Sequence, residues 1–178
     1  MEKELDENLG MGLGENSGEK LGKKFGENIE IERKFLTLEV PLDLAQFPSS
    51  QITQSYISFS PTIRIRQSDD VFYLTVKGKG HMSRVEFELE ISHTEYERLR
   101  AKVEGNEVRK RRFFVPLDSG FTAEVDIYEG ELLGLMTTEV EFSSLQLAEA
   151  FEPPLWFGED VTRERRYKNT MLALHGKP

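Results

Sequence analysis

Charged and apolar residues alternate along most of the chain, and this period of two constrains the fold more than any other feature of the sequence. In a β-strand, residues i, i+2 and i+4 lie on the same face. Glu30, Glu32 and Lys34 therefore share one face, opposite Ile31 and Phe35. The same pattern, with turn residues between the segments, predicts strands over Ile29–Leu38, Ser55–Phe59, Ile63–Gln67, Val71–Lys77, Arg84–Ile91, Val108–Val115, Phe121–Tyr128 and Thr137–Phe142.

Helices are predicted over His93–Val103, Ser143–Phe151 and Thr162–Ala173. At the start of the first helix, Thr94 and Glu97 have the spacing of an N-terminal capping box. Many antiparallel strands combined with a few helices indicate an α+β fold.

The N-terminal residues differ in composition from the rest of the chain. Glycine recurs at every fourth position from Gly14 to Gly26, and most of the residues between are charged or polar. Such a segment buries too little apolar surface to order itself. We expect residues 1–28 to be a disordered extension, with an interaction tail as the alternative, and residues 29–178 to form the folded domain.

The overall composition excludes several classes of protein. A formal net charge of -9 argues against a protein that binds nucleic acid or anionic membranes in general, because such a protein needs a basic surface. The absence of cysteine excludes disulfides, thiolate zinc sites and cysteine nucleophiles. There is neither an apolar run long enough to cross a membrane nor a secretory signal. We therefore expect a cytoplasmic protein without nucleic-acid or membrane partners.

The charged faces of the predicted strands allow two interpretations. An antiparallel sheet with its polar face in water is the ordinary one. However, acidic and basic residues recur strand after strand with few neutral polar residues among them, which suits a face that curls inward and lines a wet lumen. Lysine and arginine bind phosphate oxygens, and carboxylates hold Mg²⁺ or Mn²⁺. The second interpretation therefore predicts a site for a metal–polyphosphate ligand.

The segment Glu30-Ile31-Glu32-Arg33-Lys34 has the ExExK pattern. It is followed in order by further charged motifs on the predicted strands and by Arg166-Tyr167-Lys168-Asn169 in the predicted C-terminal helix. On these motifs the sequence resembles the CYTH superfamily, the triphosphate tunnel metalloenzymes, over essentially 29–174. It is most similar to the compact bacterial branch that hydrolyses inorganic tripolyphosphate. The resemblance implies a closed eight-stranded antiparallel β-barrel with charged residues pointing inward and helices at its flanks.

The resemblance also implies the roles of individual residues. The triphosphate would be bound by the basic residues Lys34, Arg64, Arg66, Lys77, Arg84, Lys110, Arg112 and Lys168. Metal ions, Mg²⁺ or Mn²⁺, would be held or oriented by the acidic residues Glu30, Glu32, Glu86, Glu88, Glu124, Asp126, Glu139 and Glu141. The catalytic residues would be Tyr56, Lys77 and Lys110. Charges outside these sets, namely Lys79, Glu90, Arg109 and Arg111, are expected at the surface, and Arg33 is expected to be structural.

The implied reaction is hydrolysis of a triphosphate by in-line attack of a metal-assisted water. Phosphoryl transfer depends mainly on positioning the reactants and on stabilising charge. A set of basic residues that faces a set of acidic residues therefore suffices for it. Tyr56 is the alternative activator of the water, but a phenol with a pKa near 10 is a poor base unless cations lower it. We therefore favour metal-assisted water over Tyr56.

Several functions share these residues. Within the family the tunnel serves tripolyphosphate hydrolysis, thiamine or nucleoside triphosphate hydrolysis, and cyclisation of ATP by adenylate cyclases. An organic substrate would need a platform at the tunnel mouth, and Trp156 and Phe157 are expected to pack the domain instead. A non-catalytic polyphosphate-binding module is the remaining alternative. A homodimer is possible on general grounds.

Overall fold

The computed structural model describes residues 28–40, 43–77 and 83–178. It contains one mostly antiparallel sheet of nine strands and three α-helices, so the predicted α+β class is confirmed. The strands are β1 (Asn28–Thr37), β2 (Ser49–Phe59), β3 (Thr62–Ser68), β4 (Val71–Lys77), β5 (Ser83–Ile91), β6 (Glu104–Pro116), β7 (Thr122–Tyr128), β8 (Met136–Glu141) and β9 (Phe157–Asp160). The helices are α1 (His93–Arg100), α2 (Leu145–Ala150) and α3 (Asn169–His175), with short 3₁₀ turns η1 (Leu44–Gln46), η2 (Gly130–Leu132) and η3 (Arg165–Tyr167).

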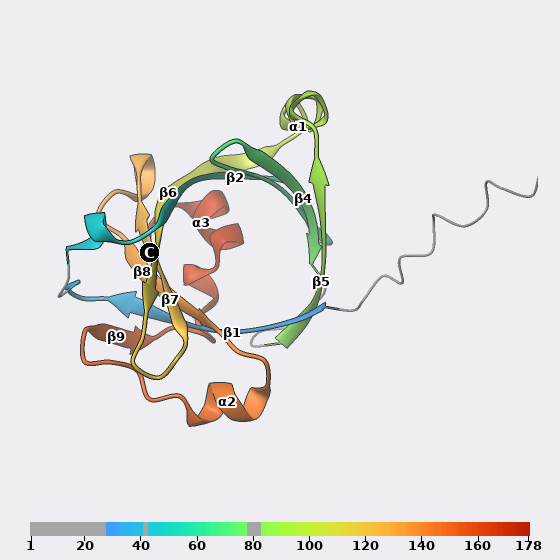
Figure 1. The fold of residues 1–178 in the computed structure, drawn as a ribbon. Helices are drawn as coiled ribbons and strands as arrows, with labels where there is room; N and C mark the ends of the chain where they lie inside the picture. Colours follow the sequence, from blue (N-terminus) through green and yellow to red (C-terminus); the bar gives the residue numbers. More distant parts are fainter. Residues whose placement is uncertain (1–27, 41–42, 78–82) are drawn as a thin grey trace, which may run out of the picture.

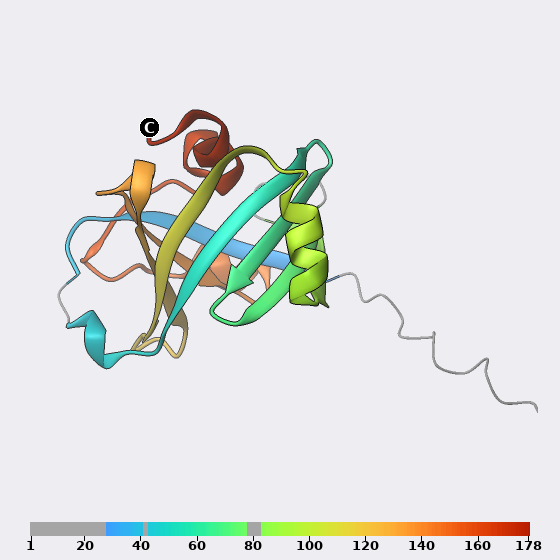
Figure 2. The ribbon, with the colours of Figure 1, turned by 90° about the horizontal axis from the view of Figure 1, so that it is seen from above.

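The strands follow the order β5-β4-β3-β2-β6-β7-β8-β1-β9, and β1 also pairs antiparallel with β5. The sheet is strongly curved, and α3 lies on its concave side (Figure 1). The view from above places α3 at one end of the sheet (Figure 2). The concave face is therefore the face on which a site bordered by α3 can form.

The sheet has nine strands, and the prediction of eight was wrong in this respect. The ninth, β9, pairs with β1 at Phe35 and Thr37. Its four residues carry no long alternation that would reveal a strand in the sequence. Pairing with β1 and burial of Phe157 in the core stabilise it instead.

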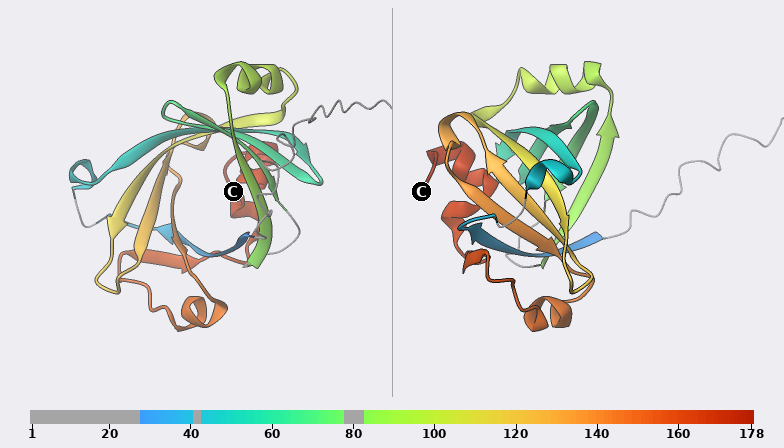
Figure 3. Two further views of the ribbon diagram at one scale, coloured as in Figure 1. Left: turned by 45° about the vertical axis from the view of Figure 1, so that its right-hand side comes forward. Right: turned by 60° about the vertical axis from the view of Figure 1, so that its left-hand side comes forward.

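One apolar core lies where α2 and β9 cover the outer face of β1, β7 and β8. Phe35 and Phe157 pack edge to face there with ring centroids 5.0 Å apart. Trp156 packs against the same core, which confirms the prediction that Trp156 and Phe157 hold the domain together. Figure 3 shows α1 and α2 on opposite outer sides of the molecule.

A second core lies under α3 and contains Tyr128, Leu132, Leu135, Leu172 and Ala173. The sequence predicts one long helix over Thr162–Ala173, whereas the chain forms η3 and then α3, with extended backbone at Lys168 between them. This break brings the ends of both elements to the concave side of the sheet, where they line the cavity described below.

Two further differences concern the ends of elements. Helix α1 is capped by a capping box of Ser92 and Glu95, not by Thr94 and Glu97, because the helix begins two residues earlier than that box requires. Strand β2 begins at Ser49, six residues before the predicted start, and pairs with β6 along this polar stretch. Within the described part of the chain, the helices are all too short or too polar to cross a membrane.

Candidate active site

The concave side of the sheet encloses a cavity of about 1020 Å³ whose lining is rich in charged side chains. Seven of the nine strands contribute to it, and the segment from Val161 to Leu174 closes one side. The charged lining residues from the strands are Glu30, Glu32, Lys34, Arg64, Arg66, Lys77, Glu86, Glu88, Lys110, Arg112, Glu139 and Glu141. Of the predicted site residues, Tyr56 and Lys168 also line it. Sequence alternation thus brings most of the predicted residues into one cavity.

Strand register explains how these side chains come together. Lys34 on β1 lies opposite Glu139 on β8, and Lys77 on β4 lies opposite Glu86 on β5. Directly opposite residues in an antiparallel pair point to the same face with their Cβ atoms about 5 Å apart. Residues of opposite charge therefore meet across the ladder.

Glu139 lies between two buried cations at the base of the cavity. Its carboxylate accepts from Lys34 Nζ at 3.0 Å and from the Arg112 guanidinium. Burial raises the pKa of Glu139, but Lys34 and Arg112 outweigh this and hold it well below its usual range. Burial likewise lowers the pKa of Lys34, but the Glu139 carboxylate outweighs it and raises the pKa overall. Both groups are therefore charged at neutral pH.

Asp126 and Glu124 lie behind this pair and are not among the residues that line the cavity. Arg112 donates to Asp126 from Nε at 2.7 Å and from Nη2 at 2.8 Å, and it also contacts Glu124. Asp126 is paired as well with the Lys110 ammonium. In this structure the two acids hold the cations in place from behind, while their predicted role toward metal stays a prediction.

The buried groups around Arg112 have shifted pKa values. Burial, followed by repulsion from Arg112, lowers the pKa of Lys110 to about 8. Burial raises the pKa of Glu124 to about 7 against the opposing effect of Arg112. A lysine poised close to neutral pH beside a cavity is a common feature of functional sites.

A second group of ion pairs lies on β3, β4 and β5. Lys77 Nζ contacts Glu30 Oε1 at 3.0 Å and Glu86 Oε2 at 2.8 Å. Arg64 donates to Thr75 Oγ1 at 3.1 Å and lies 3.5 Å from Glu86 Oε1. Lys77 and Arg64 therefore share the Glu86 carboxylate, much as Lys34 and Arg112 share Glu139.

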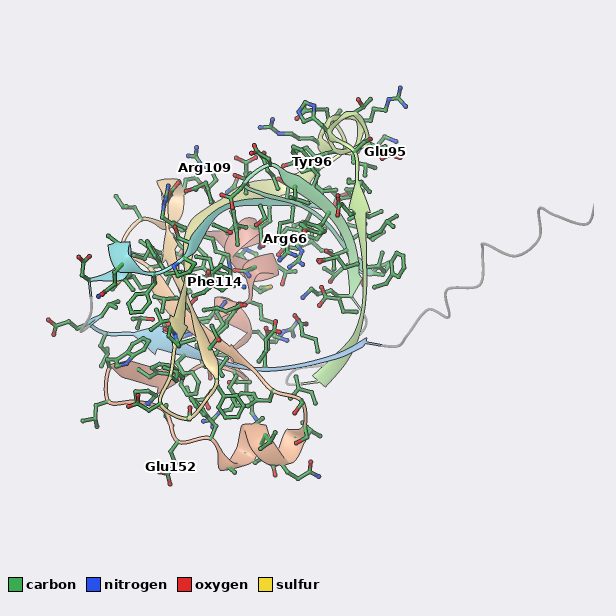
Figure 4. The ribbon with its side chains drawn as sticks, viewed as in Figure 1. Arg66, Glu95, Tyr96, Arg109, Phe114 and Glu152 are labelled. Carbon is green, nitrogen blue, oxygen red and sulfur yellow. The ribbon has the colours of Figure 1, made fainter. Side chains whose placement is uncertain are left out.

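Arg66 continues this row and points to the concave side, whereas Arg109 and Glu95 point outward (Figure 4). Its Nη2 contacts both oxygens of Glu88 at 3.0 Å. Burial, and then repulsion from Arg64, lowers the pKa of Arg66. Within the described residues, the buried Nε atoms of Arg64 and Arg66 have no hydrogen-bond partner. Buried donors are normally satisfied, whereas these two atoms are free to donate to an anionic ligand.

Three carboxylates on β1 and β8 form an acidic group at the cavity. Glu32 lies directly opposite Glu141, and Glu30 is two residues away on the same face. Partial burial, then Glu30, then Glu32 raise the pKa of Glu141. Over 28–40, 43–77 and 83–178, however, no three His, Cys, Asp or Glu side chains are arranged closely enough to hold a metal ion as they stand.

The remaining predicted site residues are placed as follows. Tyr56, only 2% exposed, lines the cavity, and its hydroxyl accepts from Gln54 Nε2 at 3.1 Å. Its ring stacks on Phe59 with centroids 5.1 Å apart. Lys168 precedes α3 and lines the cavity. Arg84 belongs to β5 and pairs through its backbone with Glu30, but its side chain is not among those described.

Some charged residues lie away from the cavity. Arg33 donates to Asp160 at 2.7 Å and to the carbonyls of Ala148 and Phe151 at 3.0 and 2.8 Å, which confirms its structural role. Glu90, Arg109 and Arg111 are exposed, as predicted, and Lys79 lies outside the described residues.

Sequence reasoning missed Gln54, Thr75 and Tyr128 as partners of the site residues. Each of them stands two residues from a predicted site residue in the same strand, namely Tyr56, Lys77 and Asp126. The alternation itself could therefore have identified them if neutral polar residues had been counted together with the charged ones.

No protein-family model matches the chain. It is 42% identical over 154 residues to an inorganic triphosphatase of Nitrosomonas europaea, a match that covers 82% of this chain and 97% of the relative. An inorganic triphosphatase of Acetivibrio thermocellus is 36% identical over 149 residues, with 81% and 92% covered. The solved structure of the inorganic triphosphatase NE1496 has a TM-score of 0.64 and 38% identity, and the match covers 84% of this chain and 97% of that one.

These relatives place the chain in the CYTH superfamily, as the resemblance predicted, and the curved antiparallel sheet with its charged cavity agrees with that assignment. Within that superfamily, it belongs to the family of the bacterial inorganic triphosphatases.

Proposed function

We propose that the protein is a divalent-metal-dependent hydrolase of triphosphates, and that its substrate is inorganic tripolyphosphate, cleaved to pyrophosphate and phosphate. The observation that carries this proposal is the cavity, in which buried arginines and lysines face a group of carboxylates. The names of the relatives give independent support.

We also propose that residues 29–178 form one triphosphate-tunnel domain in which β1–β8 close around the cavity. The pairing of β1 with both β8 and β5 supports this closure, with β9 as an addition outside it. A closed wall would exclude water from the sides of the substrate and strengthen each charge–phosphate interaction.

The basic residues are proposed to hold the triphosphate. Arg64 and Arg66 each have a buried Nε donor without a partner, and Lys34, Lys77 and Arg112 share their carboxylate partners with other cations. A triphosphate can take up the donors that remain free on these side chains. Lys110, Lys168 and Arg84 complete the proposed set.

Divalent metal is proposed to bind beside the phosphates at the acidic group of Glu30, Glu32 and Glu141. All three offer carboxylate oxygen, which Mg²⁺ and Mn²⁺ prefer, and the raised pKa of Glu141 reports negative charge that a cation would neutralise. Mg²⁺ characteristically binds through one or two carboxylates plus substrate phosphates, so a complete protein cage is unnecessary. Glu139 is a further candidate ligand, while Glu86, Glu88, Glu124 and Asp126 are proposed to orient the cations.

The proposed reaction is attack of a water oxygen on the terminal phosphorus, with cleavage of the bridging P–O bond and departure of pyrophosphate. A bound metal would polarise phosphate oxygens and lower the pKa of a coordinated water. Lys34, Arg64, Arg66 and Arg112 would stabilise the charge that develops on the phosphate oxygens. The Tyr56 hydroxyl is the candidate protein group for accepting the proton of the water.

Hydrolysis of nucleoside or thiamine triphosphates and cyclisation of ATP use the same phosphate contacts and remain alternatives. The stacked rings of Tyr56 and Phe59 in the cavity are the feature that favours an organic substituent. The relatives that are named inorganic triphosphatases favour the inorganic substrate.

The test is phosphate release from tripolyphosphate, ATP and thiamine triphosphate, each with Mg²⁺, with Mn²⁺ and with EDTA, together with an assay for cyclic AMP. Turnover of tripolyphosphate that far exceeds turnover of the organic triphosphates and stops in EDTA is the expected result. Cyclic AMP, or a preference for an organic triphosphate, would contradict the proposed substrate. Binding without any turnover would indicate a polyphosphate-binding module.

A further inference from the structure

Tyr128, the last residue of β7, is fully buried at 0% exposure, and it contacts site residues although the proposed function gives it no part in binding substrate or metal. Its ring belongs to the core beneath α3, where it packs with Val108, Leu132 and Leu172. Its hydroxyl, in contrast, is directed at polar groups of the cavity lining. A buried phenol usually has its hydroxyl satisfied, and here the partners come from three different parts of the chain.

The hydroxyl of Tyr128 donates to Asn169 Oδ1 at 2.9 Å. Asn169 is the first residue of α3 and lines the cavity. The same hydroxyl accepts from Lys34 Nζ at 3.5 Å and lies 3.4 Å from Thr137 Oγ1. One oxygen atom therefore connects a proposed phosphate-binding lysine with the first turn of the C-terminal helix.

The donors and acceptors fit this connection. The Lys34 ammonium has three N–H groups, of which Glu139 takes one at 3.0 Å and Tyr128 another. These two contacts fix the direction of the side chain and leave one N–H for a ligand in the cavity. Tyr128 has a single proton, which it gives to Asn169. Burial raises the pKa of Tyr128 to about 12, so the hydroxyl keeps this proton near neutral pH.

The ring of Tyr128 contacts a second proposed phosphate-binding lysine. Lys110 is opposite Tyr128 in the ladder of β6 and β7, and Lys110 Nζ lies 5.6 Å from the centroid of the ring. A Tyr128→Phe variant keeps this ring and its packing and removes only the hydroxyl. The substitution therefore separates the hydrogen bonds of Tyr128 from its contribution to the core.

We propose that Tyr128 is a positioning residue whose hydroxyl fixes Lys34 and the start of α3 relative to each other, so that Lys34 and Asn169 present a preformed surface to the triphosphate. This inference rests on the proposed function of the cavity. It assigns Tyr128 no contact with the substrate. Without the hydroxyl, Lys34 keeps its pairing with Glu139 but loses its second restraint, and Asn169 loses its donor.

The experiment compares wild-type protein with Tyr128→Phe, using tripolyphosphate hydrolysis and calorimetric binding of tripolyphosphate. Loss of a hydrogen bond that orients a charged group corresponds to about a 5–30-fold effect. We expect KM and Kd for tripolyphosphate to rise by this factor and kcat to change by less than about threefold, because the restraint acts on the bound ground state and transition state alike. An unchanged KM and Kd, within about twofold, would overturn the inference.

Tyr96→Phe is the matched control, because Tyr96 is also buried, at 1% exposure, lies outside the cavity lining, and has a hydroxyl without a partner among the described residues. This variant should leave KM, Kd and kcat unchanged. An equal rise of KM in Tyr96→Phe would show a general effect of the core and would overturn the positioning role.

Asn169→Ala and the double variant Tyr128→Phe/Asn169→Ala test the connection itself. When two residues act through one shared hydrogen bond, the effects of their substitutions on KM and Kd are not additive. The KM and Kd of the double variant should therefore exceed those of the more strongly affected single variant by less than about twofold. Fully multiplicative losses would overturn the connection. Wild-type protein that binds tripolyphosphate without hydrolysing it would contradict the proposed reaction but leave the Kd comparison as a test of Tyr128. Wild-type protein that neither binds nor hydrolyses it would overturn both proposals.

Discussion

Glu32 on β1 lies directly opposite Glu141 on β8 in the antiparallel ladder. Like charges in directly opposite positions destabilise a pair of strands unless a cation lies between or beside them. The raised pKa of Glu141, caused by burial and then by Glu30 and Glu32, is the electrostatic sign of this arrangement. Under the proposed metal site, we expect the stability of the sheet to depend on divalent metal.

Millimolar Mg²⁺ or Mn²⁺ should therefore raise the melting temperature of the wild-type protein, because a ligand that binds only the folded state stabilises it. In Glu141→Gln, the melting temperature without metal should be equal or higher, and the response to metal should be smaller or absent. Differential scanning calorimetry measures both. Glu152 is an exposed carboxylate away from the cavity (Figure 4), so the melting temperature of the control variant Glu152→Gln should respond to metal like that of wild type. An undiminished response in Glu141→Gln would contradict the assignment of this carboxylate.

Lys77→Ala and Glu32→Ala should each abolish turnover of tripolyphosphate while leaving the fold intact. Lys77 lies between Glu30 and Glu86 at the cavity, and removal of one preorganised charge from such a site costs on the order of a hundredfold or more in kcat. Phosphate release gives the activity, and circular dichroism checks the fold. The exposed Lys102→Ala is the control for the loss of a lysine. Full activity in Lys77→Ala or Glu32→Ala would refute the site assignment.

Lys110 should produce a pH dependence of kcat/KM. Because burial and Arg112 lower its pKa from 10.5 to about 8, the ammonium in the free enzyme loses its proton as the pH rises through about 8. The affinity for a polyanion should fall over this interval, and kcat/KM with it. Lys110→Met should have a lower kcat/KM and lack this inflection. An identical inflection in Lys110→Met would assign it to another group or to the substrate.

The same shift has the opposite consequence for stability. Between pH 8 and pH 10.5 the unfolded chain holds the proton of Lys110 and the folded chain does not. The contribution of this group to the free energy of unfolding therefore rises with pH across that interval. Chemical denaturation of wild type and Lys110→Met at pH 7.5 and pH 10 gives the free energy of unfolding of each protein. The difference between the two proteins isolates the contribution of Lys110, because the other groups titrate in both. A stability difference between the two proteins that does not change with pH would contradict the lowered pKa.

Arg33→Ala should reduce stability and spare catalysis. Arg33 joins β1 to Asp160 on β9 and to the carbonyls of Ala148 and Phe151, and its loss leaves these acceptors with fewer partners. The expected loss is about 1–3 kcal/mol of unfolding free energy, measured by urea denaturation. Since Arg33 does not line the cavity, kcat/KM should stay within about twofold of wild type at a temperature where the variant is folded. A large loss of kcat/KM in folded Arg33→Ala would make Arg33 part of the site.

The sequence was sufficient to predict the strands that carry the charged cavity lining. Strand β4 has its predicted bounds, Val71 to Lys77, because a turn precedes it and its alternation is regular. The polar stretch at the start of β2 escaped prediction because its strand conformation depends on pairing with β6 and not on its own composition. Strand β9 escaped for the same reason, since it forms only beside β1.

Alternation places a residue on a face but does not give its depth or its neighbours across the sheet. It put Glu124 and Asp126 on the same face as the other charges, yet Arg112 lies between them and the cavity, so they contact the guanidinium from behind. The prediction of one continuous helix over Thr162–Ala173 missed the extended backbone at Lys168, because helical periodicity in the sequence persists across η3 and α3. Pairing register and tertiary contacts decide these features.

The most direct test of the central claim is phosphate release from tripolyphosphate by the wild-type protein, followed through addition of Mg²⁺, removal of the metal with EDTA, and a second addition of Mg²⁺. We expect hydrolysis to one phosphate and one pyrophosphate per substrate, arrest in EDTA, and recovery when the metal returns. Hydrolysis that continues in EDTA, or tripolyphosphate that stays intact with Mg²⁺ and with Mn²⁺, would contradict the account.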